Sequence, residues 1–321
     1  MAHVMNIRRT CFFSLATALA LVLAFAQTPK RINKAVELLA QGQPVYYTGG
    51  HEGTGGGFEA GKKAAQTWAD YIMYDMEHAP FDVTALAEFM RGLYAGGPTK
   101  SGHRTPAVVI TLPIDGSDEA AVRNNAWMLK QVLATGIHGV MLCHAQSPAA
   151  VKAFVEASRL PLSRLGVGEG LGEGKRGVHG VPTAAHIWGI SPKEYMEKAD
   201  VWPLNPNGEL ILGLKIEDKY ALEHVDASLS VPGIAFAEWG PGDMALSYGI
   251  PEGSSQNPLP PQLQQARAKV LAACKKHKKF FLNTVRPTDV VAMIQEGVMI
   301  GAGGQEAAEV GRKYSKRQMP W

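Results

Sequence analysis

Short apolar runs alternate along the chain with longer segments in which apolar residues recur every three or four positions. The short runs are rich in β-branched and aromatic residues and predict strands, whereas the longer segments have the spacing of amphipathic helices. Strands are predicted at Val45–Gly49, Tyr71–Met76, Ala107–Leu112, Gly139–Cys143, Leu210–Glu217, Ile234–Trp239, Phe280–Val285 and Val298–Ala302. Helices are predicted between them, for example at Asp82–Tyr94, Glu119–Gly136, Ser147–Leu160 and Gln262–Lys279.

Strands that alternate with helices in this way indicate parallel βαβ units, and eight of them predict an α/β fold of the (β/α)8 TIM-barrel type. A doubly wound open sheet is the alternative. The chain has 321 residues, of which 46% are hydrophobic, so one domain over residues 27–321 has enough apolar surface for a large core. The glycine-rich segment Gly166–Gly189 has no sustained period and predicts a long functional loop, or else a disordered one. Because this segment follows the fourth strand, we expect it at the barrel end that carries active sites.

The first 26 residues have the features of a secretory signal peptide. Arg8 and Arg9 precede the apolar run Cys11–Ala26, which ends in the small-x-small pattern Ala24-Phe25-Ala26. The run is shorter than the roughly 20 residues of a membrane span, and an uncleaved anchor is the alternative. We therefore expect a secreted or periplasmic protein that has no membrane segment once the signal is removed.

The net charge limits the kinds of binding partner that the protein can have, and the cysteine content limits disulfides and cysteine metal sites. The net charge is +3, and residues 1–26 carry two Lys/Arg and no Asp/Glu, so the mature chain carries +1. No long basic block is present, which argues against nucleic acid as a partner and favours a small-molecule substrate. Only Cys143 and Cys274 follow the leader, and we expect neither a structural disulfide nor a cysteine zinc site.

Ionisable residues gather where the predicted strands end. The second strand runs into Asp75, Glu77 and His78, and comparable groups follow other strands, namely His51 and Glu52, His144, Glu217 and Asp218, and Glu238 and Asp243. In a barrel these carboxyl ends share one rim, where several carboxylates and imidazoles would repel one another, stay partly protonated, or bind a cation. Hard oxygen ligands such as Glu217 and Asp243 suit Mg²⁺ or Mn²⁺.

Three of these segments resemble the signatures of the HpcH/HpaI aldolase family, within the phosphoenolpyruvate/pyruvate barrel superfamily. They are DMEHAP (Asp75–Pro80), LKIED (Leu214–Asp218) and GPGDMALSYG (Gly240–Gly249), in the family's order and spacing. KRGVHG (Lys175–Gly180), followed by Trp188, resembles the family's segment before its fifth strand. The resemblance covers roughly Pro44 to Lys313.

The resemblance implies a metal-dependent, class II aldolase, a carbon–carbon lyase that cleaves a 4-hydroxy-2-keto acid or a related β-hydroxy carbonyl compound. Glu217 and Asp243 would be the ligands of Mg²⁺ or Mn²⁺, and Co²⁺ or Zn²⁺ would become further options if the extra histidines described below also face the metal. His78 would be the acid/base residue and Asp75 its orienting partner.

For the substrate, the resemblance implies binding by the backbone amides around Gly240 and Gly242 and by Arg176. It also implies a homo-oligomer, often a hexamer in the family. Two other functions are left open: a related metal-dependent reaction such as citrate-like or malyl-thioester lysis, and a catalytically silent protein that captures a small acid.

The sequence departs from the family pattern at three places. The third strand has Ile110, Thr111 and Leu112 where the family places a carboxylate-binding arginine, which makes Thr111 a candidate substrate contact. Lys215 replaces a glutamine two residues before Glu217, on the same side of the strand. It would neutralise the substrate carboxylate, form a structural ion pair, or act as a catalytic Schiff-base lysine. The extra histidines His51 and His144 would bind substrate or water, or make the metal site softer.

Overall fold

The computed structural model describes residues 31–49 and 56–320. The leader predicted at residues 1–26 and the strand-end residues His51 and Glu52 lie outside these ranges. In the described part of the chain, no helix combines the length and the apolar character needed to cross a membrane.

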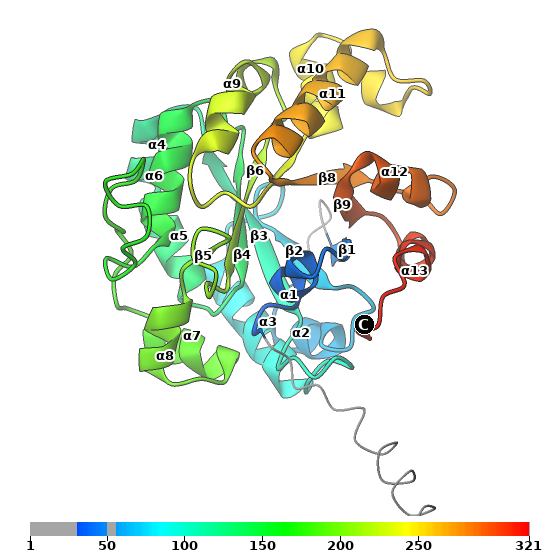
Figure 1. The fold of residues 1–321 in the computed structure, drawn as a ribbon. Helices are drawn as coiled ribbons and strands as arrows, with labels where there is room; N and C mark the ends of the chain where they lie inside the picture. Colours follow the sequence, from blue (N-terminus) through cyan, green and yellow to red (C-terminus); the bar gives the residue numbers. More distant parts are fainter. Residues whose placement is uncertain (1–30, 50–55, 321) are drawn as a thin grey trace, which may run out of the picture.

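Strands gather at the centre of the molecule and helices surround them (Figure 1). The strands are β1 (Val45–Gly49), β2 (Tyr71–Asp75), β3 (Ala107–Asp115), β4 (Gly139–Cys143), β5 (Val201–Trp202), β6 (Leu210–Lys215), β7 (Phe236–Glu238), β8 (Phe280–Thr284) and β9 (Val298–Ala302). The helices are α1 (Lys34–Ala40), α2 (Phe58–Ala64), α3 (Val83–Ala95), α4 (Glu119–Asn124), α5 (Ala126–Leu133), α6 (Pro148–Ser158), α7 (Val181–Trp188), α8 (Pro192–Lys198), α9 (Lys219–Ser230), α10 (Pro241–Ser247), α11 (Pro261–Lys276), α12 (Val290–Glu296) and α13 (Gln305–Tyr314), with a short 3-10 helix at Gly253–Ser255.

The sheet closes into a barrel of parallel strands. Each strand from β1 to β4 pairs with the next, β4 pairs directly with β6, and β6 to β9 continue in order. The pairing of β9 with β1 completes the ring. The two residues of β5 pair with the start of β6 outside this ring, and the sequence did not predict them. The predicted (β/α)8 barrel is confirmed.

The barrel interior is filled by alternate strand residues and closed at one end by α1. The inner cluster contains Tyr71, Met73, Val109, Ile211 and Phe236, together with the apolar face of α1. Successive side chains of a strand point to opposite faces, so every second residue further along each strand continues to face the interior. This alternation directs the last residues of the strands into the candidate site.

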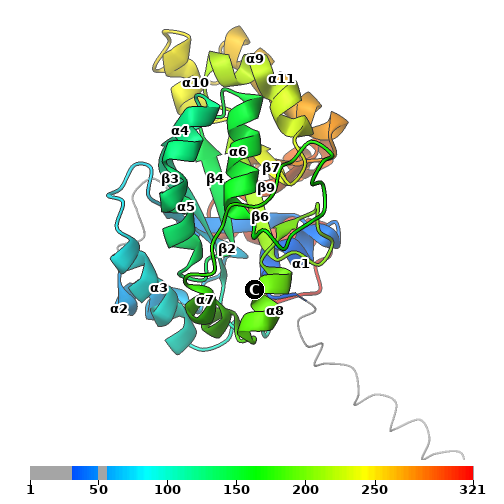
Figure 2. The ribbon, with the colours of Figure 1, turned by 90° about the vertical axis from the view of Figure 1, so that its left-hand side faces the viewer.

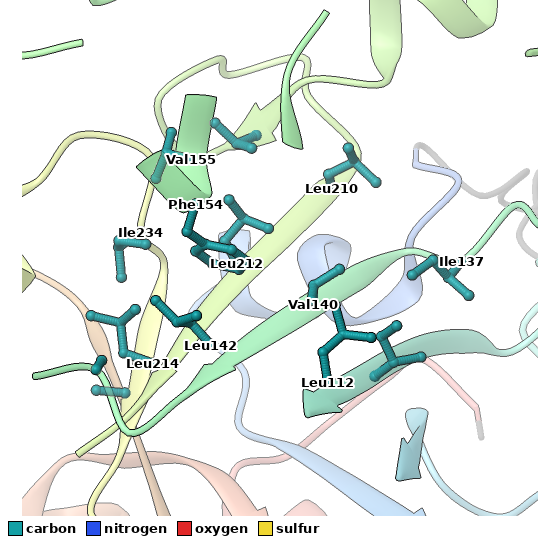
Figure 3. Packing of buried hydrophobic residues seen from close by; sticks show 14 of the residues in the cluster. Leu112, Ile137, Val140, Leu142, Phe154, Val155, Leu210, Leu212, Leu214 and Ile234 are labelled. Carbon is teal, nitrogen blue, oxygen red and sulfur yellow. The ribbon is translucent and has the colours of Figure 1, made fainter. Parts of the chain in front are cut away.

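The opposite faces of the strands pack beneath the helices. Figure 3 shows Leu142 of β4 and Leu212 of β6 on the side of Phe154 and Val155 of α6, with Leu214 of β6 beside Leu142. All five side chains are buried. Burial of such side chains is worth roughly 1.5–3 kcal/mol each, and it holds the helices on the barrel.

Helices α2 and α3 meet at two glycines. A Cβ atom placed on Gly61 of α2 would collide with the carbonyl oxygen of Phe89, and one placed on Gly92 of α3 would collide with the carbonyl oxygen of Phe58. The two helices therefore touch backbone to backbone, in an arrangement that only glycine allows at these positions.

The helix predicted at Glu119–Gly136 is divided into α4 and α5. Asn125 separates them with φ −103° and ψ 8°, and its side-chain amide donates to the carbonyl oxygen of Ala121 at 2.9 Å. Local side-chain hydrogen bonds of this kind compete with the helical backbone pattern. The helix predicted at Asp82–Tyr94 is confirmed, with Asp82 as the N-cap that accepts from the backbone N–H of Ala85.

The expectation for Gly166–Gly189 was wrong in two respects. The segment contains α7, and it follows α6, which has already returned the chain to the end of the barrel where strands begin. The indole N–H of Trp188 donates to the carbonyl oxygen of Gly136, just before β4, at 2.8 Å. Figures 1 and 2 both place α7 and α8 at the opposite end of the molecule from α10. The segment therefore does not cover the rim that carries the strand-end carboxylates.

Candidate active site

The inner-face alternation ends in polar side chains at one rim of the barrel. Met73 and Val109 face the interior, and two residues further on stand Asp75 and Thr111. In the same way Ile211 leads through Gly213 to Lys215, whose register partner on β7 is Glu238. The sequence thus changes from apolar to ionisable where the strands end, and these groups meet inside the rim.

Asp75 and His78 form a hydrogen-bonded pair. The His78 ring nitrogen Nδ1 lies 2.8 Å from Asp75 Oδ2. Asp75 Oδ1 accepts from the hydroxyl of Thr111 at 2.7 Å and from the backbone N–H groups of Glu77 and His78 at 2.8 and 3.1 Å. Burial alone would raise the pKa of Asp75, but these hydrogen bonds outweigh it and the pKa is lowered. Asp75 is therefore an ionised acceptor that fixes the orientation of the imidazole.

A chain of charges joins this pair to the opposite side of the barrel. Lys215 Nζ lies 2.6 Å from Glu77 Oε2 and 2.8 Å from Glu217 Oε2. Glu77 Oε2 lies in turn 3.7 Å from His78 Nδ1. The side chains of Lys215 and Glu217 are only 4% and 1% exposed, so the ion pair is screened little by water. Of the roles considered for Lys215, its contacts in the structure are those of an ion pair.

His144 is held in a strained backbone conformation beside Glu217. Its φ is 43°, which is rare for a residue other than glycine, and its backbone N–H donates to Glu217 Oε1 at 2.9 Å. Its ring Nδ1 lies 2.9 Å from Asp218 Oδ2, and this hydrogen bond raises the pKa of His144 to about 9 against the opposing effect of burial. The same Asp218 oxygen accepts from Gln146 at 3.0 Å. Strain of this kind is characteristic of functional sites.

The rim carries more negative than positive charge. Burial raises the pKa of Glu238 to about 7, with the nearby carboxylates adding to the effect and Lys215 opposing it. Burial also raises the pKa of Glu217, again against the influence of Lys215. For Lys215 the attraction of these carboxylates outweighs burial and raises its pKa, so its side chain is an ammonium. The carboxyl groups at this rim are those of Asp75, Glu77, Glu217, Asp218 and Glu238. Even with Glu238 partly protonated, they outnumber the two cations Lys215 and His144, an excess that favours a further cation.

The donor atoms at this rim fit a divalent metal ion. One carboxylate oxygen each from Glu77 and Glu217 and one nitrogen of His144 lie within 4.8 Å of one another. Asp75, Glu77 and His78 form a second such group. Oxygen ligands with one imidazole suit Mn²⁺ and softer ions such as Zn²⁺ as well as Mg²⁺. Within the described ranges, neither group of this kind includes Asp243.

Several residues predicted from sequence lie elsewhere or have other contacts. Asp243 lies in the first turn of α10, and the backbone of Gly240 before it packs directly against Glu217 with φ 29°, whereas Gly242 is exposed. Arg176 is buried and donates to the hydroxyl of Tyr195 and to the carbonyl oxygen at the end of α5, so the structure does not bring it to this rim. The prediction for His51 lies outside the described residues.

Glu77 is the residue that sequence analysis noted but did not assign a role. Its contact with Lys215 could not be predicted, because the two residues are 138 positions apart in the sequence. Glu238 was likewise noted without a role. Glu238 could have been found from its position at the end of β7, where it is the register partner of Lys215 on β6.

Fold and site together define a parallel (β/α)8-barrel protein with an Asp–His pair beside a group of carboxylates and an imidazole that could hold a cation. The family model described as HpcH/HpaI aldolase/citrate lyase matches residues 59–310, and the chain belongs to this family. The resemblance inferred from the three motifs is thereby confirmed.

Individual relatives are more distant. The chain is 27% identical over 215 residues to the 2-keto-3-deoxy-L-rhamnonate aldolase of Klebsiella pneumoniae, a match that covers 66% of each protein and so less than two thirds of that relative. Its fold is similar to that of an HpcH/HpaI aldolase/citrate lyase family protein from Burkholderia cenocepacia, with a TM-score of 0.63, 21% identity and coverage of 85% of this chain and 93% of that one. It is also similar to the citrate lyase beta subunit from M. tuberculosis in complex with oxaloacetate and magnesium, with a TM-score of 0.51, 12% identity and coverage of 86% and 97%. At these identities the structural likeness concerns the fold.

Proposed function

We propose that the protein is a metal-dependent carbon–carbon lyase, a class II aldolase that cleaves a 4-hydroxy-2-keto acid. The observation that supports this proposal is that an acid/base residue and a group of candidate metal ligands lie in contact at one end of the barrel. Glu77 Oε2 lies 3.7 Å from Nδ1 of the acid/base candidate His78, and a carboxylate oxygen of Glu77 also belongs to the group of candidate cation ligands with His144 and Glu217. An acid/base group beside a metal site is what an aldol cleavage requires.

Glu217 is the first candidate to hold the metal ion, with Glu77 and His144 as partners in the described part of the chain. Asp243, predicted as a ligand from the family motif, remains a second candidate. A bound divalent ion would supply Lewis-acid stabilisation of the negative charge that carbon–carbon cleavage leaves on the keto-acid fragment.

His78 supplies the proton transfer. With its Nδ1 hydrogen donated to the ionised Asp75, Nε2 is the nitrogen that accepts a proton. In the cleavage direction His78 takes the proton of the 4-hydroxyl, the bond between carbons 3 and 4 breaks, and an aldehyde leaves. His78 then returns the proton to carbon 3 of the remaining enolate, which gives pyruvate. Thr111 supports this step by fixing Asp75, which replaces the substrate contact predicted for it.

Lys215 does not act as a Schiff-base nucleophile in this proposal. Its ammonium is held by two carboxylates, and an amine must lose its proton before it can attack a carbonyl group. The substrate class is drawn from the similar rhamnonate aldolase, whose name indicates a sugar-derived keto acid. Polar side chains around the rim, such as Gln146 and His144, suit a hydroxylated substrate.

Export and oligomerisation remain proposals that rest on residues 1–26 and on the family. We propose that the mature protein acts outside the cytoplasm as a homo-oligomer. Cell fractionation of the full chain tests the first proposal, and light scattering of the purified protein tests the second.

The experiment that tests the function is pyruvate release from a panel of 4-hydroxy-2-keto acids. We expect release that EDTA abolishes and a single divalent metal restores. His78→Ala should abolish turnover, whereas His224→Ala, an exposed histidine on α9, should leave it unchanged. Metal-independent release, or full activity of His78→Ala, would contradict the proposal. Ligand binding without turnover would instead indicate a small-acid-binding protein.

A further inference from the structure

Lys215 contacts two of the carboxylates that would hold a divalent cation. Its ammonium contacts Glu77 Oε2 at 2.6 Å and Glu217 Oε2 at 2.8 Å. Both carboxylates belong to the ligand group that also includes His144. The lysine therefore stands inside the candidate metal site and not beside it.

Both oxygens of Glu217 already have a hydrogen-bond partner in this arrangement. Its Oε1 accepts the backbone N–H of His144 at 2.9 Å, and its Oε2 accepts the ammonium of Lys215. The backbone contact belongs to the turn in which His144 has a positive φ, so moving it would require that turn to refold. A lysine side chain, by contrast, turns about four single bonds. The partner that Glu217 exchanges for a metal ion is therefore Lys215.

Charge repulsion leads to the same conclusion. An ammonium and a divalent ion that share two carboxylates stand within a few ångströms of each other, where like charges repel strongly in a poorly solvated interior. The Lys215 side chain is 4% exposed and is not screened by bulk water. Glu238, its register partner on β7, offers a carboxylate to which the displaced ammonium can turn.

We propose that Lys215 is a built-in competitor for the metal ion. It neutralises Glu77 and Glu217 when no metal is bound, and it leaves Glu217 when a divalent cation binds. The lysine thereby lowers the metal affinity of the site and keeps the metal-free barrel stable. In this role it is a positioning residue that acts through the two glutamates. The inference rests on the metal site of the proposed function but not on the reaction catalysed there.

The test is Mn²⁺ binding, measured by titration calorimetry on the full chain after dialysis against EDTA, with no substrate present. Lys215→Gln, which keeps a polar side chain but removes the charge, should bind Mn²⁺ at least about ten-fold more tightly than the wild type, or ~1.4 kcal/mol. Lys215→Arg, which keeps the charge, should gain nothing. Lys219→Gln is the matched control, because Lys219 is exposed and its ammonium lies over the ring of Tyr220. Equal or weaker Mn²⁺ binding by Lys215→Gln would overturn the proposal.

Thermal melting supplies the second measurement. Metal-free Lys215→Gln should melt below the wild type, and saturating Mn²⁺ should raise its melting temperature by more than it raises that of the wild type. If the variant is unfolded without metal, Mn²⁺ should fold it, because the metal replaces the missing charge. A variant that stays unfolded at saturating Mn²⁺ would overturn the proposal.

The two proposals fail in different ways. Tighter Mn²⁺ binding by Lys215→Gln in a protein that releases no pyruvate would support the competitor and reject the aldolase. Metal-dependent pyruvate release with unchanged Mn²⁺ affinity in Lys215→Gln would support the aldolase and reject the competitor.

Discussion

Asp70 is the carboxylate whose loss should destabilise the barrel most clearly. It is fully buried just before β2, where Arg317 lies at 2.7 Å, Arg312 at 3.1 Å and Lys34 at 3.5 Å. Its second oxygen accepts the backbone N–H of Tyr46 at 2.9 Å. One buried anion thus joins the first helix, the first two strands and the C-terminal segment.

Asp70→Asn keeps the shape of the side chain and removes its charge. Three buried or partly buried cations then lose their anion, and breaking a buried pair in this way costs about 3–5 kcal/mol. For a chain of this size the loss corresponds to a fall in melting temperature on the order of 10 °C.

Urea unfolding followed by circular dichroism, together with calorimetric melting, measures the effect. Asp226→Asn is the matched control, because Asp226 also contacts two basic groups, Lys276 and His277, but is 55% exposed. Water and salt screen such a pair, so this control should unfold almost as the wild type does. A loss below about 1 kcal/mol in Asp70→Asn would refute the reasoning, since it would mean that the three cations remain compensated without the anion.

Three further predictions concern the catalytic rim and acid stability. Thr111→Val removes the 2.7 Å hydrogen bond to Asp75, and because bonds to charged groups are worth about 1.5–3 kcal/mol, kcat should fall by roughly ten-fold or more while KM changes little. Steady-state kinetics check this, and an unchanged kcat would show that Asp75 needs no such support. Glu217→Gln should lose measurable Mn²⁺ binding in calorimetry but keep its fold, and retained affinity would place the metal elsewhere. The pKa of Asp70 is lowered, since burial raises it less than Arg317, Lys34 and Arg312 lower it. The stability from this carboxylate is therefore present above about pH 4, its unfolded value, and is lost as the pH falls through the lower folded value. Acid unfolding curves of the wild type should steepen below that pH, whereas those of Asp70→Asn should be flatter.

Most of the barrel could be predicted from sequence. A strand that is buried on both faces is a short apolar run, and such a run can be recognised without knowing which strands it pairs with. Each of the eight predicted strands is present within a few residues of its expected bounds. The two-residue strand β5 carries no comparable signal. The position of Gly166–Gly189 was misjudged because the end of the barrel to which a loop belongs depends on the helix before it, and α6 had already brought the chain back.

The site could be predicted only as a set of strand-end residues. Alternation placed Lys215 on the same side of its strand as Glu217, and the structure confirms this with a direct contact between the two side chains. It could not show that Glu77 reaches Lys215, because that contact crosses the barrel between β2 and β6 and depends on how the strands are arranged around the ring. Nor could it show that Arg176 is buried against Tyr195, since a basic residue among glycines gives no sign of burial in the sequence.

The glycine contact between α2 and α3 limits how this protein can change over evolutionary time. Any side chain at Gly61 meets the backbone of α3, and any side chain at Gly92 meets the backbone of α2, so neither position accepts even alanine while the helices keep their spacing. A descendant that loses one glycine must move a whole helix, and α2 leads through Ala65 to the strand that carries Asp75. Laboratory libraries that aim to alter substrate preference should therefore leave these two positions untouched.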